Sequence, residues 1–309
     1  MGVAVKTEKL TKEYSGLLAG VRVNAVDNLD LEVQEGEIFG FLGPNGAGKT
    51  TTIKMLLGII YPTSGQAWVL DREIGHIETH RVISYLPENP YFYDHMTGKE
   101  ILSFYARLFG IREPARSKRV DELLEQVGLG REAHKSLRNY SKGMLQRIGL
   151  AQSLINDPKL LFMDEPTAGL DPIAHVDIRR LIVDLRSQGK TVFISSHQLE
   201  DVEEVCDRVA ILNRGKMVAM GKMDDLLSGG RVDLVADNVE NGVMDKVKKL
   251  GGVVSLVDGR LVVEQPDNGS IDQVIDIVRA EKGHILSVNR QRKTLEDFFV
   301  ETIQQEGKN

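Results

Sequence analysis

The chain has 309 residues, 41% hydrophobic and 27% charged, which is close to the average of soluble globular proteins and long enough for two domains. Its net charge of -6 argues against a nucleic-acid partner, because general nucleic-acid binding usually needs a basic face. No apolar run approaches the about 18 residues that span a bilayer, and residues 1–10 lack the apolar core of a signal peptide, so we expect a cytoplasmic chain.

The N-terminal segment has the alternation of apolar and polar residues that is typical of strands. The alternation is clear at residues 3–5 and 29–33, and residues 34–37 predict a turn. A strand-like apolar run at 37–42 and a helix-like run at 50–57 follow. This part therefore predicts a β segment that leads into an α/β core.

Between those two runs, residues 43–50 fit the phosphate-binding pattern G-x-x-x-x-G-K-[ST]. The glycines let the backbone turn tightly and aim N–H groups at one point at a helix N-terminus. Lys49 can then reach the terminal phosphates, and the Thr50 hydroxyl can ligate Mg²⁺. A chance glycine-rich turn is the alternative, but the whole pattern and both flanks fit. We therefore predict that the chain binds a nucleoside triphosphate.

The middle of the chain, about residues 90–152, changes to helical periodicity. Residues 99–108 and 120–127 carry apolar side chains at helical spacing, with glycine and proline breaks around them. We therefore expect a helical subdomain inserted in the α/β core.

After this insertion, strand and helix patterns alternate again. Residues 160–163 and 191–194 are continuous apolar runs, which suit strands of a parallel sheet covered on both faces. Between them, residues 172–185 predict a helix with Asp171 as N-cap and Pro172 at the first helical position. The predicted fold class is α/β.

The chain has one cysteine, Cys206. It shares a predicted helical face with Val202, Val205 and Val209. A packed core thiol is therefore expected rather than a reactive one.

A short linker at residues 228–230 separates a second segment with its own pattern. The periodicities there predict strand, helix, strand, strand, helix, strand and helix, at residues 232–235, 243–250, 252–256, 260–263, 271–281, 285–288 and 295–304. We expect a first domain at 1–227 and a small α+β domain at 231–309.

The apolar run at 160–163 ends in two carboxylates, Asp164 and Glu165. Successive side chains diverge at a strand end, so Asp164 can face Mg²⁺ while Glu165 faces the attacking water as a general base. In isolation, a solvated acidic strand end would be the preferred interpretation. Together with the phosphate loop, the pair predicts the second metal element of a phosphate-loop ATPase.

Two further segments point to anion recognition. Ser141 is a natural N-cap, and with Gly143 beside bare backbone N–H groups it predicts a second anion site. His197 follows the apolar run at 191–194, where a neutral imidazole can donate to a terminal phosphate. Taken alone, each segment would be interpreted as structural, the first as a Ser-capped helix and the second as a satisfied histidine.

In this order, the segments resemble the ATP-binding cassette (ABC) family over residues 3 to about 224. The matching motifs are Walker A at 43–50, the signature at 141–144, Walker B with its catalytic carboxylate at Asp164-Glu165, the D-loop at 168–171 and the switch histidine at His197. Tyr14 matches the aromatic residue that stacks on adenine. The fold that this implies is a phosphate-loop (RecA-like) ATPase core with an antiparallel β subdomain and the inserted helical subdomain.

The resemblance also implies the site residues and the cofactors, ATP and Mg²⁺. The implied ATP-binding residues are Tyr14, Gly43, Pro44, Asn45, Gly46, Ala47, Gly48, Lys49, Thr50 and Thr51. The implied catalytic residues are Lys49, Glu165 and His197, and the implied metal ligands are Thr50, Glu88 and Asp164. The implied residues that meet ATP on a second copy are Ser141, Lys142, Gly143 and Met144, with Asp171 in the D-loop.

The sequence departs from the family pattern at three places. Lys142 stands where glycine is usual and Met144 where glutamine is usual, which is similar to the subgroup that works with type-2 export permeases. Glu88 replaces a glutamine; it can accept from a metal-bound water but cannot donate an amide hydrogen bond. The segment between Tyr14 and residue 25 is longer than usual, which bears on the role of Tyr14.

The family implies a head-to-tail dimer of two copies and separate transmembrane permease subunits, on the cytoplasmic face of the membrane. The main hypothesis is therefore the ATPase subunit of a membrane exporter. Residues 294–299 are similar to the C-terminal motif of drug and antibiotic exporter ATPases that carry a small extra domain. An ordinary amphipathic terminal helix is the alternative explanation of this segment.

Two other functions are considered. A soluble non-transport ABC ATPase that acts on a macromolecular assembly is opposed by the single cassette and by the about ninety residues between Lys49 and Ser141, too few for a long coiled coil. A regulatory module that holds ATP without hydrolysis is opposed by Glu165, because degenerate sites usually lose that carboxylate.

Overall fold

The structure is a computed structural model that describes residues 2–15, 22–228, 230–238, 241–257, 259–266, 271–291 and 293–306. It contains two compact units, which are described separately: Met1–Lys222 with Gln305–Asn309, and Met223–Gln304. The division falls shortly before the predicted linker at 228–230, of which Gly229 lies outside the described residues. None of the helices in these ranges is long and apolar enough to cross a membrane.

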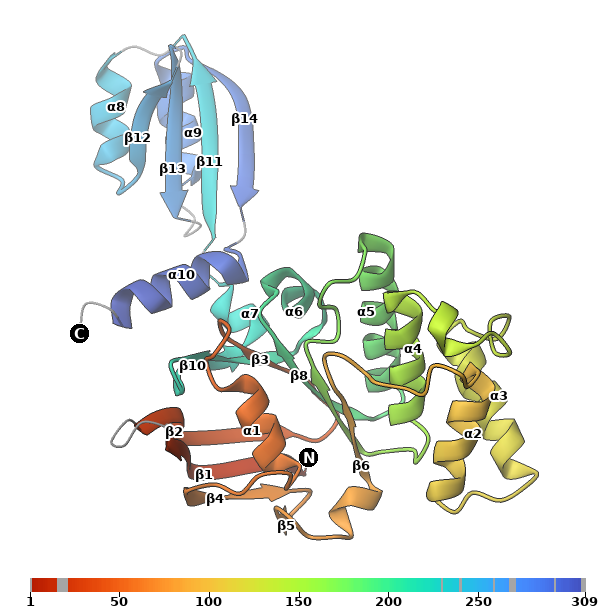
Figure 1. The fold of residues 1–309 in the computed structure, drawn as a ribbon. Helices are drawn as coiled ribbons and strands as arrows, with labels where there is room; N and C mark the ends of the chain where they lie inside the picture. Colours follow the sequence, from red (N-terminus) through yellow and green to blue (C-terminus); the bar gives the residue numbers. More distant parts are fainter. Residues whose placement is uncertain are drawn as a thin grey trace. The chain divides into compact units, whose positions relative to one another are not determined.

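An antiparallel sheet begins the first unit (Figure 1). Its strands lie in the order β2-β1-β4-β5, with bounds Arg22–Gln34, Val3–Ser15, Ser64–Val69 and Arg72–Glu73. Val5 and Leu31 are buried, whereas Asp30 and Glu32 beside Leu31 are exposed, as the alternation requires. The predicted antiparallel β subdomain is confirmed.

A second sheet forms the centre of the first unit, in the order β10-β9-β3-β8-β7-β6. Its strands are β3 Ile38–Leu42, β6 Ile83–Leu86, β7 Leu160–Asp164, β8 Thr191–Ser196, β9 Arg208–Asn213 and β10 Lys216–Lys222. Neighbouring strands are parallel, apart from β9 and β10. Because β3, β6, β7 and β8 run in the same direction, the segments that follow them gather at one edge of the sheet.

Phe193, on β8, lies at the centre of the core. Its ring centroid is 5.6 Å from that of Phe39, 5.2 Å from that of Phe41 and 5.4 Å from that of Phe162. All four rings are fully buried. Since these residues come from β3, β7 and β8, their packing holds together the three strands whose ends carry the predicted site.

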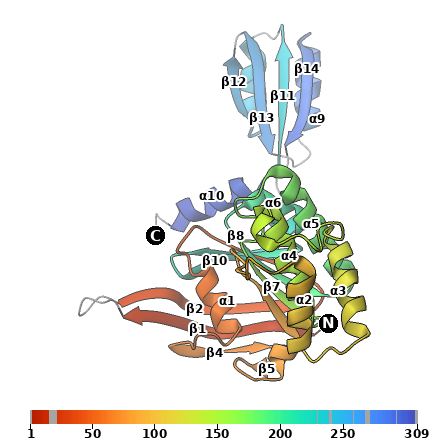
Figure 2. The same cartoon turned by 45° about the vertical axis from the view of Figure 1, so that its right-hand side comes forward.

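Helices flank the central sheet and form the inserted subdomain. They are α1 Lys49–Leu56, α2 Gly98–Leu108, α3 Ala115–Gln126, α4 Lys142–Ser153, α5 Pro172–Ser187 and α6 Leu199–Val205, with short 3₁₀ turns at Thr79–Arg81 and Leu137–Asn139. Figures 1 and 2 show α2 and α3 side by side next to α4. Helix α2 begins at a capping box in which Thr97 and Glu100 satisfy each other's backbone N–H groups. The predicted inserted helical subdomain is confirmed.

The predicted helical face around Cys206 is wrong, although the thiol is buried as expected. Helix α6 ends at Val205, Cys206 is extended, and Val209 lies on β9. The chain leaves the helix because Asp207 N and Oδ2 both bond the backbone of Ile38 on β3. Burial raises the pKa of the Cys206 thiol well above its usual value, and the charges of Asp207 and Glu37 add to this effect.

The second unit is an antiparallel sheet with helices. The strands lie in the order β12-β13-β11-β14, with bounds Val253–Val257, Arg260–Pro266, Arg231–Asp237 and His284–Gln291. The helices are α7 Met223–Leu226, α8 Asn241–Lys248, α9 Ile271–Ala280 and α10 Leu295–Glu306. The chain order from β11 to β14 is β-α-β-β-α-β, and β11 lies between the third and the last of these strands, which is the split βαβ arrangement.

Inside this unit, Val232 and Leu234 of β11 pack with Val243 of α8 and Val274 of α9. The predicted strands and helices are therefore present in the predicted order, as a small α+β unit. Helix α10 begins where Thr294 Oγ1 accepts a hydrogen bond from Asp297 N, and Asp297 Oδ2 accepts one from Thr294 N. Asp297 Oδ2 also accepts from the Thr294 hydroxyl at 2.7 Å, and this bond first, then the one from Thr294 N, lowers the pKa of Asp297.

Candidate nucleotide-binding site

The phosphate loop joins β3 to α1 at the edge where the parallel strands end. Gly48 caps α1 with a φ of +107°, a conformation that disfavours any residue with a side chain, and a Cβ there would overlap the carbonyl oxygen of Ala25. No side chain caps this helix in the described chain. The first backbone N–H groups of α1 are therefore available to an anion, as the pattern predicts.

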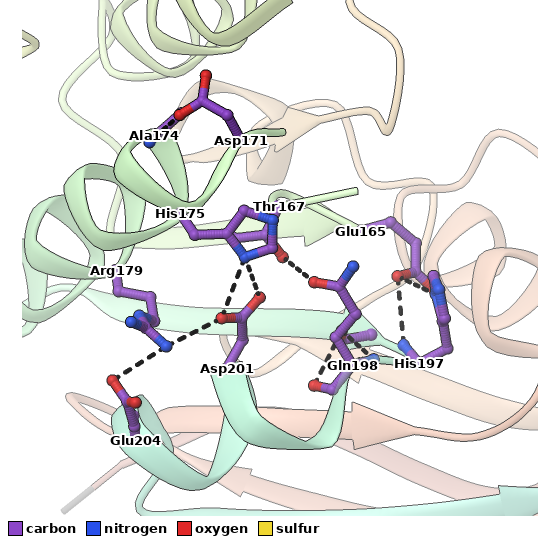
Figure 3. A network of polar contacts seen from close by, with 11 residues as sticks. Glu165, Thr167, Asp171, Ala174, His175, Arg179, His197, Gln198, Asp201 and Glu204 are labelled. Atoms are coloured by element: carbon purple, nitrogen blue, oxygen red, sulfur yellow. Dashed lines mark hydrogen bonds and ion pairs between the residues drawn. The ribbon is translucent and has the colours of Figure 1, made fainter. Parts of the chain in front are cut away.

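Lys49, Glu165 and His197 meet beside this loop. Lys49 Nζ lies 2.6 Å from the carbonyl oxygen of Gly43 and 3.1 Å from Glu165 Oε1. The other carboxylate oxygen of Glu165 lies 2.7 Å from His197 Nδ1 and accepts from His197 N at 3.2 Å (Figure 3). The Lys49 and Glu165 side chains are only 6% and 10% exposed, so the carboxylate is held by both neighbours with little screening by water.

Asp164 lies between Thr50 and two residues that the motifs did not reveal. Its Oδ1 accepts from Thr50 Oγ1 at 3.2 Å and from the Ser195 hydroxyl, and its Oδ2 accepts from Tyr85 OH at 3.4 Å. Burial raises the pKa of Tyr85 well above its usual value, and the Asp164 charge adds to this effect, so the phenol stays a donor. Hydroxyl and carboxylate oxygens are the ligands that Mg²⁺ prefers, so Thr50 and Asp164 fit the predicted metal pair.

Tyr85 and Ser195 could have been found from one signal. Tyr85 lies three residues before Glu88, and Ser195 directly follows the predicted strand at 191–194 and lies two residues before His197. Because β6, β7 and β8 are adjacent and parallel, their ends bring both hydroxyls to Asp164.

A cavity of about 290 Å³ opens at this edge. It is lined by Ala25, Pro44, Asn45, Gly46, Ala47, Gly48, Lys49, Thr50, Thr51, Glu88 and Glu165. Glu88, which follows β6, therefore lies close to the phosphate loop and to Glu165, and its role beside the metal stays a prediction. Ala25 was not selected from the sequence, where nothing marks it.

The signature residues lie elsewhere in the same unit. Ser141 Oγ caps α4 by accepting from Met144 N at 3.3 Å, and a Cβ at Gly143 would lie 3.1 Å from Ala174 on α5. Lys142 Nζ reaches the D-loop, where a Cβ at Gly169 would overlap it.

The D-loop ends at α5, where Asp171 Oδ1 accepts from Ala174 N at 2.9 Å, which confirms the predicted N-cap. Within the described residues, the lining of the cavity includes neither the signature residues 141–144 nor Asp171.

Tyr14 is not among the described residues that line the cavity. It pairs with Val23 across β1 and β2, the residue is 43% exposed, and Lys12 Nζ lies 5.4 Å from the centroid of its ring. The long segment that follows it includes residues 16–21, which lie outside the described residues. Stacking of Tyr14 on adenine therefore stays a prediction.

The geometry agrees with the comparisons to known proteins. The ABC transporter family model matches residues 26–168. An ABC transporter ATP-binding protein of Nostoc sp. is 42% identical over 310 residues, which cover 98% of this chain and 90% of that protein. The chain belongs to the ATP-binding proteins of ABC transporters. The predicted family is confirmed, and this ABC protein binds and hydrolyses ATP.

A further relative of the ABC protein is named for bacitracin transport. The bacitracin transport ATP-binding protein BcrA of Bacillus licheniformis is 37% identical over 313 residues, 98% of either chain, so the similarity includes the second unit. Among solved structures, cbiO1 of Clostridium perfringens covers 81% of this chain and 96% of its own, at 27% identity and a TM-score of 0.67. The ATP-binding cassette MJ0796, solved as a dimer bound to ADP and Pi, covers 71% of this chain and 98% of its own, at 25% identity and a TM-score of 0.65.

Proposed function

We propose that this ABC protein is the ATPase subunit of an exporter, which works at the cytoplasmic face of the membrane and drives separate permease subunits. The proposal of ATP hydrolysis depends on one observation. Lys49, Glu165 and His197 meet beside the N-terminus of α1, which no side chain caps among the described residues. The exporter part is supported by relatives named for bacitracin transport and, at 43% identity over 206 residues, for fluoroquinolone export in Mycobacterium tuberculosis.

In the proposed site, residues 43–51 bind the phosphates of ATP. Thr50 and Asp164 would hold Mg²⁺, with Glu88 near it as a further acceptor, and the ion would neutralise charge on the phosphates. The terminal phosphate replaces Glu165 as the anionic partner of Lys49. Glu165 then accepts the proton of the attacking water as general base.

His197 contacts Glu165 first, and it contacts the terminal phosphate only later. An ionised Glu165 can only accept, so His197 Nδ1 carries the proton in their 2.7 Å contact, and Nε2 of a neutral ring is then an acceptor. Donation from Nε2 to a terminal phosphate therefore needs either a second ring proton or a tautomer change after Glu165 leaves. In this proposal the second route operates: Glu165 leaves His197 when phosphate binds, and the ring then changes tautomer.

The active form is proposed to be a head-to-tail dimer, in which ATP on Lys49 of one copy meets Ser141 and Gly143 of the other. Two observations support it. Among the residues that the structure describes, those lining the cavity do not include the signature of the same chain, and the related cassette MJ0796 was solved as a dimer.

The permease is proposed to dock on the helical subdomain and the loop at Glu88. Leu108 and Phe109, at the end of α2, are 67% and 47% exposed and line a cavity of about 890 Å³ with Ile111 and Arg119. Arg81, Asn156 and Asp157 also line this cavity, so it combines exposed apolar side chains with charged and polar ones. Such a surface suits an amphipathic helix of a membrane subunit.

Purification of the tagged chain from detergent-solubilised membranes of its source cells tests the proposal, with ATPase activity measured on the same sample. Co-purification of a polytopic membrane protein together with ATP hydrolysis is the expected result. Hydrolysis without any membrane partner would favour the soluble alternative, and binding without hydrolysis would favour the regulatory module.

A further inference from the structure

A polar cluster ties α5 to α6 beside the nucleotide site (Figure 3). Asp201 of α6 lies at its centre, with its Oδ2 3.2 Å and its Oδ1 3.4 Å from His175 Nδ1 of α5. Arg179 of α5 donates to Asp201 Oδ1 at 3.1 Å and lies 3.0 Å from Glu204 Oε2. His175 and Arg179 are one turn apart, as are Asp201 and Glu204, so one face of each helix meets the other.

The cluster joins the first turns of the two helices. His175 N bonds the carbonyl oxygen of Asp171, the N-cap of α5 and the last residue of the D-loop. Asp201 lies in the first turn of α6, which His197 and Gln198 precede. The D-loop and the histidine that contacts Glu165 therefore each lead directly into a turn of this cluster.

A second contact joins the segment after β7 to Gln198, the residue that follows His197. Thr167, between Glu165 and the D-loop, donates to Gln198 Oε1 at 3.1 Å. Gln198 N in turn donates to Ser196 Oγ at 2.9 Å. The segment around His197 is thus held from the β7 side and from the α5 side.

Helix α5 also holds the signature helix. Arg147 of α4 pairs with Asp177 of α5 at 2.6 Å, and Gly143 packs closely on Ala174. A movement of α5 relative to the sheet would therefore be transmitted to the signature on one side and to α6 on the other.

The Asp201 side chain is 11% exposed, and those of His175 and Arg179 are 22% and 19% exposed. A largely buried ion pair contributes little net stability, because the loss of hydration offsets most of the attraction, but it requires one specific arrangement of its partners. An apolar contact between α5 and α6 would hold the helices together without setting this register.

We propose that Asp201 is a positioning residue, which His175 and Arg179 hold so that His197 keeps its place relative to the D-loop and the signature. It acts through His197 and does not touch ATP. When the signature of one copy closes on the ATP of a second copy, His197 of the first copy then moves with it at the first copy's own site. This inference rests on the proposed ATPase function and dimer.

Four variants test it in the full chain: Asp201→Asn, Asp201→Ala, Asp201→Glu and Arg186→Gln. Arg186 is the matched control, because it makes another ion pair from α5, with Asp207 at 2.6 Å, at the far end of the helix. The readouts are kcat and KM for ATP, the Kd of ATP in EDTA, and the melting temperature.

We expect kcat to fall by about tenfold in Asp201→Asn and Asp201→Ala while KM and Kd change by less than about twofold, because no residue lining the cavity is altered. Asp201→Glu should recover most of kcat, since the carboxylate still reaches α5. Arg186→Gln should keep the wild-type kcat.

Three results would overturn the inference. One is an unchanged kcat in Asp201→Ala. Another is a parallel loss of kcat, ATP affinity and melting temperature in Asp201→Asn without recovery in Asp201→Glu, which indicates a merely structural role. The third is an equal loss of kcat in Arg186→Gln. Failure of the proposed function is seen separately, as a wild-type chain that does not hydrolyse ATP.

Discussion

Replacing Glu165 by glutamine should strengthen ATP binding while it stops efficient hydrolysis. Lys49 Nζ lies 3.1 Å from Glu165 Oε1, so a terminal phosphate must take Lys49 from a carboxylate that already neutralises it. Glutamine keeps the shape of Glu165 and an oxygen that can accept from Lys49, but it carries no charge. The variant therefore removes a competitor of the phosphate.

The size of the effect follows from the strength of the contact. Lys49 stays charged in the variant, so its contact with the new amide oxygen is still a hydrogen bond to a charged group. Glu165→Gln removes only the attraction of the opposite charge, which is on the order of 1 kcal/mol. Screening does little here, because the two side chains are 6% and 10% exposed. A gain of about 1 kcal/mol corresponds to a roughly fivefold lower Kd for ATP. Turnover should fall about 100-fold or more, the usual contribution of a positioned general base.

Isothermal titration with ATP in EDTA at fixed ionic strength measures the affinity, and phosphate release measures turnover. Glu122→Gln is the matched control, because it makes the same change of net charge at an exposed residue of α3 that pairs with Lys118 at 3.8 Å. An equal or higher Kd in Glu165→Gln, with normal thermal unfolding, would refute the competition between Glu165 and phosphate. Near-normal turnover would remove Glu165 as the base.

The remaining predictions concern other parts of the chain. Lys49→Ala should raise the Kd of ATP about 30-fold or more in the same titration, because a charge-assisted contact worth about 2 kcal/mol or more is lost; an unchanged Kd would contradict the assignment of the phosphate loop. Tyr85→Phe removes the bond to Asp164, so half-maximal activity should need about tenfold more Mg²⁺ while the Kd of ATP in EDTA stays the same; an unchanged Mg²⁺ titration would exclude this role. Phe193→Ala should lower the free energy of unfolding by about 3–5 kcal/mol in a urea titration, since three buried rings lose their central neighbour. Removal of residues 230–309 should leave ATPase activity intact, because the motifs all precede them; loss of activity in a folded fragment would give the second unit a catalytic or dimerisation role.

Patterns that depend on neighbouring residues predict much of the fold. The buried strands β3, β7 and β8 are continuous apolar runs, and the cap of α5 at Asp171 is a local hydrogen bond, so both are evident in the sequence. The same holds for the phosphate loop, whose glycines are required by local backbone geometry at Gly48.

The error at Cys206 shows where local patterns end. Helical spacing continues through Val209, but Asp207 bonds Ile38, a residue far away in the sequence, and the chain turns into β9 instead. A pairing between strands that are distant in sequence decides this, and periodicity contains no information about it.

The sequence motifs predict the reaction of this ABC protein, because phosphate binding and proton transfer need particular side chains in a particular order. Which groups surround them is decided by the order of the strands. Parallel pairing of β6, β7 and β8 brings Tyr85 and Ser195 to Asp164, and the packing of α5 on α6 brings His175 and Arg179 to Asp201. The physical reason is that these contacts join residues 22 to 79 positions apart, so they exist only once the sheet has assembled.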